Sequence, residues 1–248
     1  MKENLNEAID ELEDEDLIAE LTQKNIIIFG RNLIRNYDIG DFIVKAVDNV
    51  SLQVEEGEFM AIKGPSGAGK TTLLNLLGGL DTPNSGIIYN QGVRISDMDQ
   101  ETLTIFRLAS SGFIFQNYNL ISTLTAEENV MLPMNLAGMR LKEQRDRAVK
   151  LLTMVRLDDR REHLPFQLSA GEQQRVAIAR ALSNNPPVIL ADEPTANLDK
   201  TTSQFLLDLF KDLKDKEKTI IVVTHDEDLI GIAHRVISFD DGKIIEEN

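Results

Sequence analysis

The chain has 248 residues, of which 42% are hydrophobic, so it is long enough for one large α/β domain or two small ones with a sizeable core. A formal net charge of −15 argues against a surface that grips nucleic-acid phosphates, and nucleic acid is not an expected partner. The absence of cysteine excludes disulfides, thiolate metal sites and cysteine nucleophiles.

The first 24 residues differ in composition from the rest of the chain. They hold nine acidic residues against two lysines, a net −7, and they lack the basic and apolar regions of a secretory signal. Leu5, Ile9 and Leu12 share one helical face, which predicts a short solvated helix or a disordered lead; a docking segment for a basic partner is the alternative. We treat residues 1–24 as an acidic extension and residues 25–248 as the main domain.

The pattern of hydrophobic residues after the extension predicts strands first and helices later. Short β-branched runs through about residue 63 predict strands, and "TTLLNLL" (71–77) predicts a helix. Residues from about 124 to 163 have helical spacing, which begins at a capping box made by Thr125 and Glu128.

Two continuous apolar runs follow Pro165, which marks the end of the helical region. "VILAD" (188–192) and "TIIVVTHD" (219–226) are typical of buried parallel strands. The chain therefore predicts a parallel α/β core with an inserted helical subdomain and an antiparallel edge near the N-terminus. No run of roughly 20 apolar residues is present, so any membrane association is expected to be peripheral.

The stretch "GPSGAGKT" (64–71) fits the pattern G-x-x-x-x-G-K-[ST]. It follows a strand and opens a helix, so glycine-permitted backbone N–H groups and the helix N-terminus can surround an anion. Lys70 would reach the β- and γ-phosphates of a nucleotide, and the Thr71 hydroxyl would join the coordination shell of Mg²⁺. The residues expected at the phosphates are Gly64, Ser66, Gly67, Ala68, Gly69, Lys70, Thr71 and Thr72.

Two acids end the buried strand "VILAD". Asp192 lies at its carboxyl end, where it can hold Mg²⁺ through water beside the phosphate loop. Glu193 is one residue further, and a carboxylate there can orient and deprotonate a water for in-line attack on the γ-phosphate.

A second anion site is predicted at "LSAGE" (168–172). Ser169 and Glu172 form a capping box, so the first turn of the following helix offers free N–H groups. Since one phosphate loop already encloses one nucleotide, this second site makes sense if it serves the nucleotide of another copy. We therefore expect two chains to close head to tail over two ATP molecules.

These elements together resemble the nucleotide-binding subunit of an ATP-binding cassette (ABC) transporter over about residues 25 to 245. "GPSGAGKTT" resembles Walker A, "LSAGE" the signature and "VILADE" Walker B. Gln116 resembles the Q-loop glutamine, which links Mg²⁺, water and the helical subdomain; Asp199 resembles the D-loop aspartate. His225 resembles the switch histidine that bonds to the γ-phosphate, and Tyr37 the aromatic residue that stacks on adenine.

The resemblance implies a P-loop NTPase (RecA-like) fold with an antiparallel β subdomain and a helical subdomain inserted at about residues 117–165. It implies an Mg²⁺-dependent ATPase that forms a homodimer on ATP binding and works with integral membrane subunits, at the inner face of the cell membrane. The catalytic residues would be Glu193, His225, Gln116 and Lys70. The Mg²⁺ site would be Thr71, Gln116 and Asp192, and further nucleotide contacts would come from Tyr37, Ser169, Gly171, Glu172 and Asp199.

Two sequence features refine this expectation. Ala170 replaces the first of the two usual signature glycines, which we expect to weaken or slow closure only mildly because alanine is comfortable early in a helix. The stretch "VMLPMNLAGM" (130–139) either receives a helix of the membrane subunit or belongs to the core of the helical subdomain.

Within the family, the chain most resembles the branch that serves lipoprotein release, macrolide-type export and related mechanical tasks. The resemblance lies in the stretches "NLLGGLDTPNSG" (75–86), "FIFQNYNLISTLTAEENVMLP" (113–133) and "DEPTANLD" (192–199). An alternative function is a regulatory ABC ATPase of a cell-envelope or division complex, which would share every motif. A soluble ABC protein of repair or translation would usually show a long insertion or a second cassette. A small-molecule kinase would have no use for "LSAGE" or "ANLD" (196–199).

Overall fold

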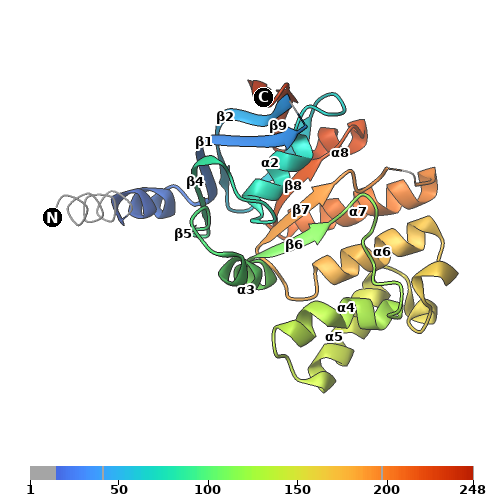
Figure 1. The fold of residues 1–248 in the computed structure, drawn as a ribbon. Coiled ribbons are helices and arrows are strands. Elements are labelled where there is room, and N and C mark those ends of the chain that lie inside the picture. The colour runs from blue at the N-terminus through green and yellow to red at the C-terminus, as the bar shows by residue number, and fades with distance from the viewer. Residues whose placement is uncertain (1–14, 41, 197, 248) are drawn as a thin grey trace.

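The computed structural model describes residues 15–40, 42–196 and 198–247. Two sheets and several helices form the predicted α/β fold, with an antiparallel sheet at one end, a parallel sheet in the middle and a helical layer beyond it (Figure 1).

The antiparallel sheet has the strand order β2-β1-β4-β5 and comes from the N-terminal part of the chain. β1 and β2 form a long hairpin that closes where Ile39 lies opposite Phe42. The strands are β1 (Ile26–Ile39), β2 (Phe42–Glu55), β4 (Ser85–Asn90) and β5 (Val93–Arg94). This sheet is the antiparallel edge that the sequence predicts.

The second sheet has the order β10-β9-β3-β8-β7-β6, and all its strands are parallel except β10 at one edge. The strands are β3 (Phe59–Lys63), β6 (Ser111–Ile114), β7 (Val188–Asp192), β8 (Thr219–Val223), β9 (Arg235–Asp240) and β10 (Lys243–Glu247). Because β3, β8 and β7 are neighbours, the segments that follow their carboxyl ends meet at one edge of the sheet. These segments are the phosphate loop, "THD" and Glu193.

Helix α2 (Lys70–Leu77) joins the two sheets. It contacts β1, β2 and β4 on one side and β7 and β8 on the other, which agrees with its place in Figure 1. Leu73 and Leu76 are fully buried in the cluster between the sheets. The start of α2 is therefore held rigidly over the carboxyl edge of the parallel sheet.

The remaining helices pack mainly around the parallel sheet. They are α3 (Gln100–Ser110), α4 (Ala126–Leu136), α5 (Leu141–Met154), α6 (Ala170–Ala181), α7 (Lys200–Asp215) and α8 (Glu227–Ile232), with 3₁₀ turns η1 (Asp158–Arg160) and η2 (Pro165–Gln167). The side chains of β3 alternate between two hydrophobic clusters, one on each face of the parallel sheet. Phe59 and Ala61 belong to the cluster that includes residues of α4, α5, α6 and α7, whereas Met60 and Ile62 belong to the cluster that includes residues of α2.

Helices α4, α5 and α6 pack on one another below the parallel sheet (Figure 1). The predicted capping box of Thr125 and Glu128 opens α4. Within the stretch 130–139, Val130 and Met134 are fully buried, so these two side chains belong to the subdomain core. The subdomain boundaries at about 117 and 165 stay a prediction.

The described part of the acidic extension is helical over residues 15–23 and projects from the antiparallel sheet (Figure 1). This helix is not wholly solvated, because Leu21 is buried against Ile26 and Tyr89. Leu5, Ile9 and Leu12, which carry the predicted helical face, lie outside the described residues.

Candidate active site

A cavity of about 800 Å³ opens at the carboxyl edge of the parallel sheet, beside the start of α2. Its volume lies within the range of small-molecule sites, roughly 300–1,000 Å³. Its lining includes the predicted residues Tyr37, Ser66, Gly67, Ala68, Gly69, Lys70, Thr71, Thr72, Gln116, Asp192, Glu193 and His225. The fold thus brings together residues that lie up to 188 positions apart in the chain.

The phosphate loop needs glycine at two positions. Gly64 has φ 153° and Gly69 has φ 101°, in the region that residues with side chains rarely adopt. A Cβ at Gly64 would meet the carbonyl oxygen of Phe239 at 1.8 Å, and one at Gly69 would meet that of Ala46 at 1.9 Å. The loop is therefore packed tightly against backbone on both sides. Gly69 caps α2 without a side-chain bond, so its first turn keeps donors for an anion.

Lys70 is buried, with 6% of its surface exposed. Its ammonium donates to the carbonyl oxygens of Gly64 at 2.7 Å and Pro65 at 2.8 Å. An ammonium has three N–H groups, so one remains for a phosphate oxygen while the other two fix its position.

Thr71 and Asp192 meet across the mouth of the loop. The Thr71 hydroxyl lies 3.1 and 3.0 Å from the two carboxylate oxygens of Asp192. Burial raises the pKa of Asp192, against the opposing effects of Thr71 and the Lys70 charge. A hydroxyl and a carboxylate, with the amide of Gln116 on the same cavity wall, form the all-oxygen donor set that Mg²⁺ prefers. Among the described residues, no group of three or more His, Cys, Asp or Glu side chains is placed to hold a metal ion.

Glu193 and His225 form a second pair. His225 Nε2 lies 3.2 Å from Glu193 Oε1, and the backbone N–H of His225 donates to Glu193 Oε2 at 3.3 Å. Burial is the main cause that raises the pKa of Glu193. Glu193 has φ 45°, a strained conformation for a residue with a side chain, and its N–H is fixed by the Val223 carbonyl at 2.8 Å. The carboxylate is therefore aimed into the cavity by a turn held between β7 and β8.

Tyr37 lines the cavity from β1 and is held in place by two neighbours. Its hydroxyl donates to Asp81 Oδ2 at 2.7 Å, and the Arg35 guanidinium lies 4.8 Å from the centre of its ring. Arg35 also pairs with Asp81 at 2.8 Å. These contacts fix the plane of an aromatic ring at the end of the cavity, a geometry that suits base stacking; the adenine contact stays a prediction.

The signature residues lie elsewhere. Ser169, Gly171, Glu172 and Asp199 are not among the residues that line this cavity. The predicted capping box is present: Ser169 Oγ accepts from the Glu172 N–H at 3.3 Å, and Glu172 Oε2 accepts from the Ser169 N–H at 2.8 Å. Glu172 also lies 3.3 Å from Arg160, and its pKa is lowered, with the bonds to Ser169 and Arg160 outweighing burial.

Asp199 is used locally. It caps α7 by accepting from the N–H groups of Thr201 at 2.9 Å and Thr202 at 3.0 Å, and from the Thr202 hydroxyl at 2.7 Å. Gly171 packs directly on Thr202, so the first turns of α6 and α7 are in contact.

Some cavity residues were not predicted. Ala46, Thr195, Ala196, Val223 and Asp226 also line it. Thr195 and Asp226 follow the predicted strand-end motifs, and their position directly after these motifs could have identified them as cavity residues. Ala46 gave no such signal, because it reaches the cavity only through the packing of β2 on the phosphate loop.

Comparisons with known proteins show the family to which this chain belongs. The family model for ABC transporters matches residues 47–196. The chain belongs to the ABC transporter family. It is an ATP-binding subunit of that family and an ATPase.

Relatives of two kinds match this ABC subunit. An uncharacterized ABC transporter ATP-binding protein of Methanocaldococcus jannaschii, MJ1508, is 50% identical over 89% of this chain and 98% of its own length. The macrolide export ATP-binding/permease protein MacB of Hyphomonas neptunium is 48% identical over 88% of this chain but only 34% of its own. The chain thus spans about a third of that relative.

Solved structures agree with the fold. The ATP-binding cassette MJ0796 of Methanocaldococcus jannaschii, in a dimeric post-hydrolysis state bound to ADP and Pi, has a TM-score of 0.85 and 44% identity. The match covers 89% of this chain and 97% of that one. The P-loop NTPase fold expected from the motifs is confirmed.

Proposed function

We propose that two copies of this ATPase bind two Mg·ATP head to tail, hydrolyse ATP and drive a membrane partner in export, lipoprotein release or mechanotransmission. The observation that carries the proposal is the separation of the phosphate loop from the signature within one chain. Lys70 lines the cavity whereas Ser169 does not. A second copy can bring its signature to the open cavity, and the dimeric state of MJ0796 supports that arrangement.

Glu193 is the proposed general base. Its two oxygens face His225, and its raised pKa favours accepting a proton from an attacking water. The contact with His225 supports a role for this residue in positioning Glu193, and His225 would also donate a hydrogen bond to the γ-phosphate. Lys70 and the first turn of α2 would stabilise the phosphate charge.

Mg²⁺, when bound, would neutralise charge on the β- and γ-phosphates. Thr71, Asp192 and Gln116 would hold it, and the Thr71 hydroxyl bonded to Asp192 supports this assignment.

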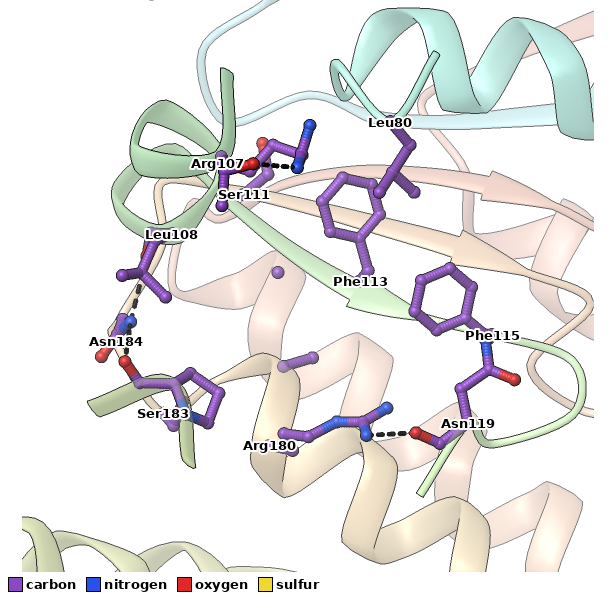
Figure 2. A pocket seen from close by; sticks show the side chains of 14 residues that line it. Leu80, Arg107, Leu108, Ser111, Phe113, Phe115, Asn119, Arg180, Ser183 and Asn184 are labelled. Atoms are coloured by element: carbon purple, nitrogen blue, oxygen red, sulfur yellow. Dashed lines mark hydrogen bonds between the residues drawn. The ribbon is translucent and has the colours of Figure 1, made fainter. Parts of the chain in front are cut away.

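The proposal of a membrane partner is supported by a groove of about 280 Å³, which lies between α3, β6, α4 and the end of α6 (Figure 2). Phe113 and Phe115 form one wall with stacked rings, 5.9 Å between centroids, and Leu80 lies above them. Phe115 lines this groove whereas the next residue, Gln116, lines the nucleotide cavity. An occupant of the groove would therefore act one residue away from the catalytic site.

Arg180 links the groove to the signature helix. It lies near the end of α6, and its guanidinium donates to the carbonyl oxygen of Asn119 (Figure 2) and to that of Tyr118, both beyond the Q-loop glutamine. Burial without a carboxylate among these contacts lowers the pKa of Arg180. The segment after Gln116 is thus tied to the helix that carries Ser169.

The MacB relatives support a permease as the occupant, because their printed name joins ATP-binding and permease functions in one chain, of which this chain matches about a third. In the described ranges, no helix is both long and apolar enough to cross a membrane. We propose that the membrane-spanning part is a separate subunit, and that the chain acts at the cytoplasmic face of the membrane through it. Direction and cargo would be set by that subunit.

The test uses tagged Glu193→Gln protein, which should bind ATP, stall hydrolysis and accumulate as a closed dimer. We expect this dimer to capture an integral membrane protein from detergent-solubilised membranes of the source cell, identified by mass. Phe115→Ser in the same background is the control: it should still dimerise with ATP but lose the capture.

Other outcomes contradict parts of the proposal. Unimpaired ATP turnover by the Glu193→Gln variant would show that Glu193 is not the general base. Recovery of soluble proteins alone, despite a closed dimer, would contradict the membrane role. Capture of proteins of a cell-envelope or division complex that does not transport a substrate would favour the alternative function, a regulatory ABC ATPase.

A further inference from the structure

The β1–β2 hairpin carries exposed apolar side chains beside the nucleotide cavity. Tyr37 lies directly opposite Val44, and directly opposite residues in an antiparallel pair project from the same face. Phe42 is two residues before Val44, with no register shift between them, so it shares that face. Phe42 is 76% exposed and Val44 44%. An apolar stripe of Val44 and Phe42 therefore continues outward from Tyr37.

A second exposed aromatic residue lies just before the signature. Phe166 is the middle residue of η2, three positions before Ser169, and it is 77% exposed. The turn is fixed: the Leu164 N–H donates to Gln167 Oε1 at 2.8 Å, and the Leu168 N–H to the Pro165 carbonyl at 3.1 Å. The phenylalanine ring is thus held away from its own chain.

Phe166 and Phe42 are the two most exposed large hydrophobic side chains in the described part of the chain. Single exposed hydrophobic residues are ordinary on protein surfaces. Here, however, one flanks the signature and the other flanks the cavity, which are the two features that must meet if a dimer closes head to tail.

We propose that Phe166 of one copy packs against Phe42 and Val44 of the second copy in the ATP-bound dimer. The inference rests on the head-to-tail dimer of the proposed function and adds a protein–protein contact to it. Because the proposed dimer is two-fold symmetric, the same contact occurs twice in it. Each copy carries a net charge of −15, so the copies repel one another and an apolar contact supplies attraction that does not depend on charge.

The absence of native cysteine makes a crosslinking test clean. Phe42→Cys and Phe166→Cys are combined in the full-length Glu193→Gln chain and treated with a short bis-maleimide, with and without ATP. We expect a covalent dimer that depends on ATP and on both cysteines. The matched control combines Phe166→Cys with Leu136→Cys, another strongly exposed apolar position, on α4 (66%), and should give no covalent dimer.

A second measurement does not depend on crosslinking. The dissociation constant of the ATP-driven dimer should rise about tenfold or more in Phe166→Ala and in Phe42→Ala, and the double variant should be little worse than either single one because both lose the same contact. ATP affinity of the monomer should stay within about twofold.

The outcomes separate this inference from the proposed function. If the Glu193→Gln chain dimerises with ATP by size-exclusion chromatography but the cysteine pair does not crosslink and the alanine variants dimerise normally, the contact is wrong while the head-to-tail dimer stands. If Phe166→Ala impairs only capture of the membrane protein, that protein is the occupant and the inference is overturned. If no ATP-driven dimer forms at all, the proposed function fails and this contact with it.

Discussion

Replacing Gly171 with alanine is expected to destabilise the junction between α6 and α7. A Cβ at this position would lie 2.8 Å from both Cγ2 and Oγ1 of Thr202. Thr202 is itself buried, and its hydroxyl donates to Asp199 at 2.7 Å. Thr202 can turn away only by giving up its hydroxyl bond to Asp199, so either that bond is lost or the two helices separate.

The cost follows from this overlap. Overpacking of a buried contact costs roughly 1–3 kcal/mol, and the gain from replacing glycine by alanine in a helix offsets up to about 1 kcal/mol of that. The net cost is then at most about 3 kcal/mol, and at about 2–4 °C per kcal/mol for a chain of this size the midpoint of thermal unfolding should fall by up to about 12 °C. ATP turnover should fall as well, because the shift moves both the signature and the D-loop.

The chain offers a matched control for this change. Gly231 in α8 has nothing within 4 Å of its added Cβ, so Gly231→Ala makes the same chemical change in open space and should leave the midpoint unchanged or slightly higher. Thr202→Ala should recover part of the loss in the Gly171→Ala background. Equal midpoints for Gly171→Ala and Gly231→Ala by differential scanning calorimetry would refute the reasoning.

Three further predictions concern catalysis and dimerisation. Because burial raises the pKa of Glu193 and the base must be ionised, hydrolysis at saturating ATP should fall on acidification with a midpoint above the ordinary glutamate value of about 4.3; a midpoint at or below that value would contradict the role. Arg160→Gln should weaken ATP-driven dimerisation by up to about fivefold, as measured by titration of the dimer. The effect is no larger because the ion pair of Arg160 and Glu172, 3.3 Å apart, is partly exposed and therefore weak. In a Glu172→Gln background, where this pair is already broken, the effect should be much smaller. Ala170→Gly should change turnover less than tenfold, and a larger rise would show that the methyl group obstructs closure.

Features that depend on three or four consecutive residues could be predicted from the sequence. The capping boxes at Thr125 and Ser169 are both present, and α6 begins at Ala170. The phosphate loop lies between a strand and a helix as its pattern requires. Local hydrogen bonds define these features, so a short pattern suffices.

Contacts between distant segments could not be predicted in the same way. Asp81 holds Tyr37 from 44 positions away, and the side chain of Leu21 packs on Tyr89. No periodicity in the sequence encodes such pairs, because they depend on how β4 and the helix over residues 15–23 dock on β1. The turn at Glu193, with its positive φ, is another example, since the N–H of Glu193 bonds to Val223 on the neighbouring strand, 30 positions away.

Asp199 shows how a local contact limits a functional role. A carboxylate offers about four acceptor positions, and three are used by Thr201 and Thr202 at the start of α7. Little capacity remains for a direct bond to a nucleotide. Asp199 therefore acts most directly on Thr202, whose methyl and hydroxyl groups pack on Gly171 of the signature. In the proposed head-to-tail dimer, a partner chain that moved Asp199 would through this contact also move Gly171 of the same chain, and the two nucleotide sites would be coupled.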